Sequence, residues 1–294
     1  MPEMNAHAKI NLFLSVREKD EKGYHPLKTV FQPIELHDKV MVEEIRAPGI
    51  RLSCNNNDVP TDNRNTAYKA AELMAREAGR DLNSSGIKIF IEKHIPLSSG
   101  LGGSAIDAAP VIRMLNTTWG MGLTIERAEE IGSRIGADVP QAIRNRTCYA
   151  EGYGDKIILD EFSLKPIHVC IAIPNVYMSN MNGRKTAFLY DRIDSIRSGP
   201  AADECRMLAA LSSRSWGVIA QEMHNDFETV AFHFHPELRR VKEMMMESNA
   251  LGAMLSGSGG AVFGLFRETK DMHRAVERVR SKDEIRTIFQ THTI

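Results

Sequence analysis

A glycine- and serine-rich segment, PLSSGLGGS at residues 96–104, has the composition of a loop that holds phosphate groups. It follows a segment that alternates isoleucine with other residues and precedes an apolar stretch, so it joins a strand to a helix. Glycine lets the backbone adopt positive φ and approach a ligand closely, and free amides at a helix start attract anions. The residues expected to contact a phosphate-bearing ligand here are Pro96, Ser98, Ser99, Gly100, Leu101, Gly102, Gly103 and Ser104.

This loop differs from two common phosphate-binding motifs. It does not end in the Gly-Lys-Ser/Thr of a Walker A motif, and a long strand-rich segment precedes it, unlike the GxGxxG that follows a first Rossmann strand. An ordinary strand-to-helix turn with additional glycines is the structural alternative. The loop alone does not decide between the two.

Composition excludes several other classes of function. The 294 residues carry 37 basic and 38 acidic side chains, without the basic excess of a nucleic-acid-binding protein. No apolar run approaches the roughly 20 residues that span a bilayer, and the polar start lacks the layout of a signal peptide. The four cysteines form no CxxC pair, which argues against a zinc site or a disulfide framework. We therefore expect a cytoplasmic protein without a membrane or nucleic-acid partner.

The order of expected elements predicts an α+β protein. Runs of strands followed by helices favour this class over a doubly wound sheet. We expect two domains, at residues 1–155 and 156–294. The expected strands are Ala8–Val16, Lys28–Leu36, Lys39–Ile45, Gly86–Glu92, Lys156–Leu159 and Ile167–Ile173. The expected helices are Asn65–Gly79, two that begin at Thr124 and Asp138, Asp203–Gly217, Met223–Phe232 and Pro236–Asn249.

Three separated segments resemble the signature motifs of the GHMP kinases, in the same order. They are AKINLFLSV, IPLSSGLGGSAIDAA and LSGSGGAVFGLF. Five further segments are similar to the diphosphocytidyl-methylerythritol kinases within that superfamily: GYH, DNRNTAYKAA, IGADVP, YAEGYGD and NDFE. The resemblance covers almost the whole chain. It implies the two-domain GHMP kinase fold with the active site in the cleft between the domains.

The same resemblance implies an activity. It is ATP-dependent phosphorylation of the 2-hydroxyl of 4-diphosphocytidyl-2-C-methyl-D-erythritol, in the non-mevalonate route to isoprenoid precursors. ATP, Mg²⁺ and a small cytidyl diphosphate substrate follow from it, with a monomer or weak homodimer as the expected assembly. The alternatives are a GHMP kinase for another small alcohol, which the Gly-Tyr-His segment disfavours, and a catalytically silent ligand binder.

Lys9 and Asp138 match the catalytic pair of this family. Asp138 would take the proton of the attacking hydroxyl, and Lys9 would keep Asp138 ionised and stabilise developing charge. Retention of both residues argues against a silent binder. The structural alternatives are a helix N-cap for Asp138 and a solvent-facing strand position for Lys9. Asn11 lies on the same side of the strand as Lys9 and could orient substrate hydroxyls.

The family match also supplies binding residues. Tyr24 and His25 match a cytosine-binding pair, with a simple turn as the alternative. Phe188 is the expected second aromatic against the base, with Tyr177 and Tyr190 as alternatives. Asn65 and Lys93 are expected to contact the nucleotide, and a helix cap is the alternative role for Asn65. Gly257, Ser258 and Gly259 are expected to contact the substrate, with a tight turn as the alternative. No residues are expected to form a metal site of their own.

The glycine loop departs from its family. Members usually have GLGGGSSDAA or GLGGGSSNAA, whereas here Ser104 replaces a glycine, and Ala105 and Ile106 replace two serines. Hydroxyls at this place can bind phosphate or magnesium, so Ser104 and the upstream serines would have to supply them. Asp107 keeps its usual place and could hold magnesium through water; an exposed helix carboxylate is the alternative.

Overall fold

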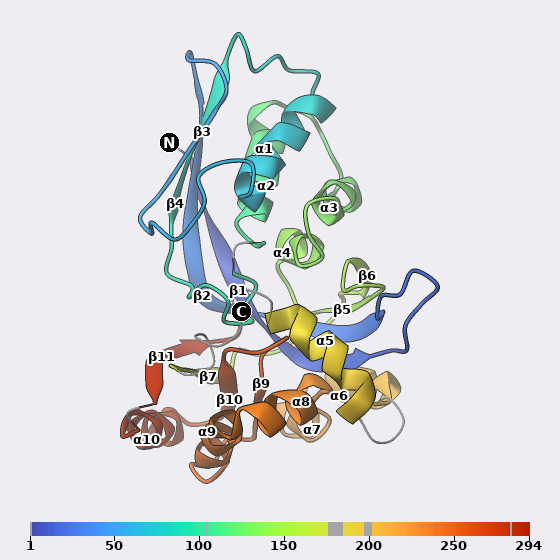
Figure 1. Cartoon of the computed structure of the whole chain (residues 1–294), viewed down its shortest axis with the longest axis vertical. Helices are drawn as coiled ribbons and strands as arrows, with labels where there is room; N and C mark the ends of the chain where they lie inside the picture. The colour runs from blue at the N-terminus through green and yellow to red at the C-terminus, as the bar shows by residue number, and fades with distance from the viewer. Residues whose placement is uncertain (1, 104, 176–184, 197–201, 283) are drawn as a thin grey trace.

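A long antiparallel hairpin of β1 and β2 forms the centre of the larger of two sheets (Figure 1). The structure is a computed structural model that describes residues 2–103, 105–175, 185–196, 202–282 and 284–294. Two register irregularities interrupt the pairing of β1 with β2, one between His7 and Lys9 and one between Asn11 and Phe13. Such irregularities re-aim side chains, and here they flank Lys9 and Asn11.

The larger sheet has the strand order β3-β4-β2-β1-β8, and β5 joins β2 to β6. Its strands are β1 (Glu3–Val16), β2 (Leu27–Ile45), β3 (Ile50–Cys54), β4 (Gly86–Glu92), β5 (Cys148–Glu151), β6 (Lys156–Leu159) and β8 (His224–Asn225). Four helices lie together on one side of it (Figure 1): α1 (Thr66–Glu77), α2 (Ala108–Thr118), α3 (Ile125–Ser133) and α4 (Val139–Arg144).

Alternation of side chains builds the core beneath these helices. Ile87, Ile89 and Ile91 of β4 are fully buried on one face, as the period of two in the sequence predicts. Helix α1 meets that core with alanines and Met74, which are also buried. The side chain of Asn65 begins α1 by accepting a hydrogen bond from Ala67 N.

The smaller sheet is antiparallel throughout, with the order β11-β7-β10-β9. Its strands are β7 (His168–Pro174), β9 (Gly252–Leu255), β10 (Val262–Phe266) and β11 (Ile285–His292). The remaining helices are α5 (Lys185–Ile196), α6 (Glu204–Ser212), α7 (Trp216–Gln221), α8 (Phe227–Phe234), α9 (Pro236–Met246) and α10 (Thr269–Arg280). After β11, Thr293 pairs with Ile34 of β2 and so joins the two sheets.

The α+β class is confirmed, and several element boundaries differ from expectation. The two strands expected over residues 28–45 form one strand, β2. The helix expected over Asp203–Gly217 is divided into α6 and α7, because Arg214 between them has a φ of 55°. Helix α8 begins only at Phe227, since His224 and Asn225 pair with β1.

The passage from one sheet to the other lies between β6 and β7. Strand β6 pairs with β5 and therefore belongs to the larger sheet, whereas the expected second domain begins at residue 156. The division after residue 155 stays a prediction for the domains as folding units. In the part of the chain that the structure describes, no helix has the length and apolar character needed to cross a membrane.

Candidate active site

The three motif segments meet around the glycine loop. From the first, Lys9 N donates to Leu101 O at 3.1 Å. From the third, Ser256 Oγ donates to Gly100 O at 3.1 Å and Ala261 N donates to Ser99 O at 2.8 Å. The loop between β4 and α2 is thus held from both sides by segments more than 80 residues away in the chain.

Glycine is required where these segments touch. Gly100 has a φ of 82°, and a Cβ there would lie 2.2 Å from Ser256 O. Gly260 has a φ of 111°, and its Cβ would lie 2.6 Å from Ser98 O. Both conformations are costly for other residues. The glycines therefore permit close backbone approach, which the alternative of an ordinary turn does not require.

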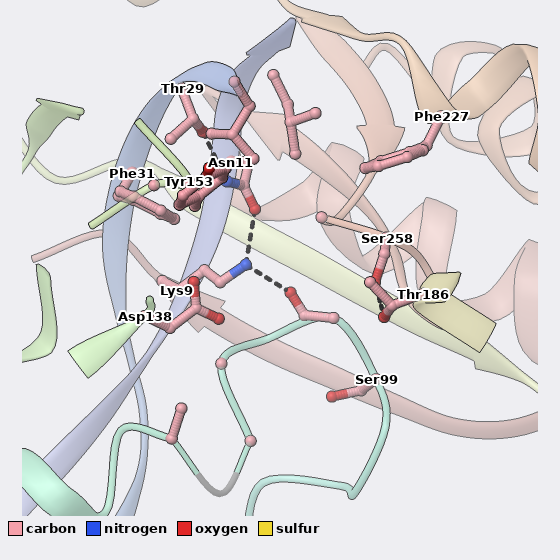
Figure 2. Close-up of a pocket in the computed structure, with 18 of the residues that line it drawn as sticks. Lys9, Asn11, Thr29, Phe31, Ser99, Asp138, Tyr153, Thr186, Phe227 and Ser258 are labelled. Carbon is pink, nitrogen blue, oxygen red and sulfur yellow. Dashed lines mark hydrogen bonds between the residues drawn. The ribbon is translucent and has the colours of Figure 1, made fainter. Parts of the chain in front are cut away.

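A cavity of about 430 Å³ opens beside the loop (Figure 2). The expected site residues that line it are Lys9, Asn11, Ser98, Ser99, Gly100, Gly102, Gly103, Asp138, Gly257 and Ser258. Three further expected residues, Pro96, Leu101 and Gly259, are close in sequence to lining residues but do not line the cavity themselves. Ser104 lies outside the described residues.

Lys9 is buried at the floor of this cavity, with 4% of its surface exposed. Its Nζ donates to Asn11 Oδ1 at 2.7 Å and to Gly100 O at 3.0 Å. Burial lowers the pKa of Lys9, and the negative charge of Asp138 acts in the opposite direction. The alternative of a solvent-facing lysine is therefore wrong.

Asp138 occupies the N-cap position of α4, yet its side chain makes no capping hydrogen bond. Its carboxylate instead lies on the cavity wall near Lys9 (Figure 2). The N-cap alternative therefore does not account for an aspartate here, because a capping carboxylate would accept a hydrogen bond from an amide of the first turn.

Asn11 connects Lys9 to β2. Its Nδ2 donates to Thr29 Oγ1 at 2.8 Å, and Thr29 Oγ1 donates to Phe13 O at 2.7 Å. The amide oxygen of Asn11 accepts from Lys9, so this chain of bonds determines which way the amide faces. Asn11 and Thr29 together orient the Lys9 ammonium; a contact of Asn11 with substrate hydroxyls stays a prediction.

A second cavity of about 630 Å³ adjoins the first. Tyr153, Thr186 and Tyr190 line both cavities and form the boundary between them. The second contains Tyr24, which is 65% exposed, and His25, which is buried. The ring of His25 stacks on that of Tyr190, with centroids 5.6 Å apart and an interplanar angle of 18°.

Comparison with known proteins gives the same family for both halves of the chain. Residues 65–146 match the model of the GHMP kinases N terminal domain, and residues 207–285 match that of the GHMP kinases C terminal domain. A 4-diphosphocytidyl-2-C-methyl-D-erythritol kinase of Caldicellulosiruptor saccharolyticus is 37% identical over 279 residues, which are 94% of this chain and 92% of that protein. The chain belongs to the 4-diphosphocytidyl-2-C-methyl-D-erythritol kinase family of GHMP kinases.

Further relatives agree. The protein of this name from Clostridium perfringens is 35% identical over 292 residues, covering 99% of this chain and 98% of that protein. A crystal structure of 4-(cytidine 5'-diphospho)-2C-methyl-D-erythritol kinase superposes with a TM-score of 0.79 at 30% identity, covering 99% of each chain. L. major mevalonate kinase has a TM-score of 0.69 at 17% identity, with 100% of this chain and 96% of that one covered, and shares the fold. The expected family, fold and small-molecule kinase class are confirmed.

Phe188, the expected second aromatic against the base, does not line the kinase's second cavity. The Phe188 ring packs against Phe234, with centroids 5.0 Å apart, and lines neither cavity. Positions 188 and 190 are two residues apart on α5, so they point to different sides of the helix. Tyr190, one of the alternatives, lines both cavities. Its contact with a base stays a prediction, and Tyr177 lies outside the described residues.

Asn65 and Lys93 do not line either cavity of the kinase. Asn65 is engaged as the cap of α1, and its Nδ2 donates to Pro60 O at 2.8 Å. The Lys93 ammonium is enclosed by Asp38 and Asp107. Asp107 is therefore not the exposed helix carboxylate of the sequence alternative, and its Oδ2 is bound by Lys93 rather than facing the cavity.

The two residues that replace loop serines lie in different surroundings. Ala105 is half-buried and lines the kinase's first cavity, whereas Ile106 is fully buried in the core. Ile106 also packs closely on the loop, since a Cβ on Gly102 would lie 2.8 Å from Ile106 Cγ2. Of these two positions, only 105 can therefore present a side chain to a ligand in this cavity.

We expect these positions to respond differently when the serines are introduced. Ile106→Ser should lower the free energy of unfolding by about 3 kcal/mol, because it leaves a void and buries a hydroxyl. Ala105→Ser should change it by less than about 1 kcal/mol. Urea unfolding followed by circular dichroism measures both. Equal losses for the two variants would show that the burial of Ile106 is misassigned.

The residues that the sequence analysis missed include Thr29, Tyr153 and Thr186, which line the first cavity, and Asn225, which supports it. Asn225 Nδ2 donates to Leu255 O at 2.8 Å and to Gly257 O at 2.9 Å, so it shapes the third motif. Tyr153 and Asn225 lie within the YAEGYGD and NDFE segments, which gave a signal for the segment without identifying the residue. Thr29 and Thr186 had no such signal.

Proposed function

We propose that this kinase transfers the γ-phosphoryl group of ATP to the 2-hydroxyl of 4-diphosphocytidyl-2-C-methyl-D-erythritol, a step in non-mevalonate isoprenoid precursor synthesis. One observation carries the proposal: the cavity that contains Lys9, Asp138 and the glycine loop adjoins a second cavity, which is lined by Tyr24, His25 and Tyr190. The acceptor named for the family has a phosphorylatable alcohol at one end and a flat base at the other.

His25 has the chemistry to read a cytosine. Its Nδ1 lies 2.7 Å from Arg17 O, and since a carbonyl only accepts, Nδ1 carries the hydrogen in this bond. In the neutral ring Nε2 is then an acceptor. It is buried, lies 3.5 Å from Asp194 Oδ2 and has no hydrogen-bond partner among the described residues. The exocyclic amino group of cytosine is a donor that Nε2 could satisfy.

Hydroxyl groups lie where the two cavities join. Thr186 Oγ1 and Ser258 Oγ are 2.9 Å apart, and Thr186 lines both cavities (Figure 2). We propose that they contact the diphosphate of the acceptor, while the amides of the glycine loop hold the phosphates of ATP. The described residues contain no cluster of three metal-ligating side chains. Mg²⁺ would then be held largely by phosphate oxygens and water.

Lys9 and Asp138 supply the polar chemistry in this proposal. Asp138 accepts the proton of the attacking hydroxyl. Lys9, oriented by Asn11 and Gly100 O, compensates the negative charge that gathers on the transferred group. The fold alone would also suit a kinase for another alcohol, but the aromatic second cavity favours a cytidyl acceptor.

The test is phosphate transfer from ATP with Mg²⁺ to the cytidyl acceptor, followed by ADP release and by mass spectrometry of the product. Mevalonate and homoserine serve as acceptors for comparison. We expect turnover with the cytidyl acceptor alone. Turnover with mevalonate or homoserine instead would refute the acceptor, and binding of the cytidyl compound without ADP release would refute the kinase activity.

A further inference from the structure

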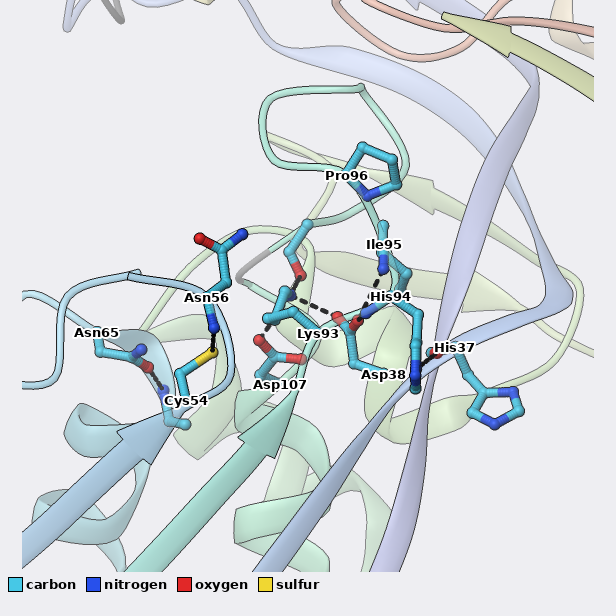
Figure 3. A network of polar contacts seen from close by, with 12 residues as sticks. His37, Asp38, Cys54, Asn56, Asn65, Lys93, His94, Ile95, Pro96 and Asp107 are labelled. Atoms are coloured by element: carbon cyan, nitrogen blue, oxygen red, sulfur yellow. Dashed lines mark hydrogen bonds and ion pairs between the residues drawn. The ribbon is translucent and has the colours of Figure 1, made fainter. Parts of the chain in front are cut away.

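Three ionisable side chains are buried together at the base of the glycine loop (Figure 3). The exposed fractions of the Asp38, Lys93 and Asp107 side chains are 0%, 2% and 1%. Lys93 Nζ bonds to Asp38 Oδ2, to Asp107 Oδ2 at 2.9 Å and to Gly103 O at 3.4 Å. An ammonium group has three donors, and all three are used within this triad and the loop.

The triad closes the base of the loop. Lys93 precedes the loop at the end of β4, and Asp107 follows it immediately before α2. Asp38 of β2 contacts the same end as Lys93, because its Oδ1 accepts from His94 N at 2.6 Å and from Ile95 N at 2.8 Å. Both ends of the loop are therefore tied to one another and to a central strand. None of the three residues lines the cavity.

The charges of the triad do not balance if both carboxylates are ionised. One ammonium and two carboxylates would leave a buried net charge of about −1, which is costly away from water. Asp107 Oδ1 is buried and has no hydrogen-bond partner among the described residues. Burial raises the pKa of Asp107 to about 7, with Lys93 opposing the rise and Asp38 adding to it. A proton on Asp107 makes the triad neutral.

Cys54 at the end of β3 is a further titratable group that interacts electrostatically with the triad. Burial raises the pKa of its thiol, so Cys54 stays neutral near pH 7 and leaves the charge balance to the three residues. His94 is exposed and points to Glu92, with His94 Nε2 3.2 Å from Glu92 Oε1.

We infer that Asp38 and Asp107 are positioning residues for phosphoryl transfer, which act through Lys93 by holding the two ends of the glycine loop in place. They contact neither cavity, so their effect reaches the nucleotide through the loop backbone. The inference rests on the proposed role of this loop in binding ATP and is independent of which alcohol accepts the phosphate.

The test compares Asp107→Ala with the isosteric Asp107→Asn. Without the side chain at 107, one end of the loop is released, and we expect the Kd for Mg²⁺-ATP, measured by calorimetry, to rise about tenfold. The KM for the acceptor should change less than about twofold. An asparagine can still accept from Lys93 and is neutral, so Asp107→Asn should keep the Kd within about threefold of the parent at pH 6.5.

The pH dependence of the Kd for Mg²⁺-ATP distinguishes a positioning role of Asp107 from a role in fold stability alone. Above pH 7 Asp107 loses its proton, and the triad then places negative charge beneath the loop. The Kd of the parent protein should therefore rise from pH 6.5 to 8.5, and that of Asp107→Asn should rise less. Glu92→Gln, which removes a partly exposed carboxylate one residue from Lys93, should retain the parent's response.

Each possible result of these experiments bears on the inference or on the proposed function. An Asp107→Ala protein that melts at a lower temperature but binds ATP normally would show that the triad only stabilises the fold. If that variant does not fold, the Asp107→Asn pH response decides alone, and a response equal to the parent's would overturn the inference. No ATP binding by the parent protein would overturn this inference and the proposed function together. ATP binding without transfer to the cytidyl acceptor would overturn the proposed function and leave this inference standing.

Discussion

Asp138→Ala is expected to lower kcat about 1,000-fold while it leaves the KM for ATP and for the acceptor within about threefold. The reason is that Asp138 lies on the cavity wall near Lys9 and makes no bond that supports α4. Its loss removes the proton acceptor and one hydrogen bond to the attacking hydroxyl, while the expected contacts to the base and the phosphates remain. Steady-state kinetics with the cytidyl acceptor, at saturating ATP and Mg²⁺, measures the effect.

A matched variant tests whether Asp138 serves the helix instead. Asp203 holds the corresponding N-cap position of α6, and its side chain does accept a hydrogen bond, from Cys205 N at 3.0 Å. Asp203→Ala should therefore lower the free energy of unfolding by about 1 kcal/mol and leave kcat unchanged. Asp138→Ala should leave the free energy of unfolding nearly unchanged and lower kcat. If both variants lost stability equally and kept their kcat, Asp138 would be a cap and not a base.

Many of the residues that line the first cavity were predictable, because they lie in short sequence motifs that each correspond to a local backbone conformation. Lys9, the glycine loop and Gly257 each lie in a motif, and the structure brings these segments together. The contacts between the motif segments could not be predicted from the sequence. Nothing in the residue order indicates that Asn11 and Thr29 orient Lys9 or that Asn225 bonds to Gly257 O, because these bonds depend on how strands pair.

Lys93 and Phe188 lie away from the cavities for physical reasons that the sequence does not reveal. Lys93 was predicted as a nucleotide contact, but its partner Asp38 lies 55 residues earlier, and composition cannot reveal a buried ion pair across a sheet. Phe188 was preferred to Tyr190 although both lie on α5, because one helical position differs from the next by about 100° and the sequence does not indicate the phase. For Asn65, by contrast, the cap alternative was already open and the structure shows that bond.

The fold class was predictable from the sequence, whereas the boundaries of several helices and strands were not. Ile87, Ile89 and Ile91 show a strand by their alternation, and β4 has the predicted bounds. The short β8 carries no such signal, since two residues cannot show a period. Its pairing with β1 depends on the tertiary fold, which also explains why α8 begins later than its composition suggests.

The choice between Tyr190 and Phe188 leads to the second large expected effect. Tyr190→Ala should raise the KM for the cytidyl acceptor by about tenfold to a hundredfold, the range for loss of one aromatic ring from a stack on a base. The KM for ATP should stay within about twofold, because ATP is expected at the glycine loop. Tyr190→Phe should behave like the parent, since burial raises the pKa of Tyr190 to about 12 and its ring, not a phenolate, is what the cavity presents.

Phe188→Ala is the matched control, because it removes a neighbouring ring from the same helix. Tyr190 also packs edge-on against Phe227, with centroids 4.9 Å apart, as Phe188 does against Phe234. Both alanine variants should therefore lose stability by a comparable amount, on the order of 3 kcal/mol, which thermal unfolding checks. Only Tyr190→Ala should weaken the acceptor. A larger rise in acceptor KM for Phe188→Ala than for Tyr190→Ala would reverse the assignment and place the base on the other side of α5.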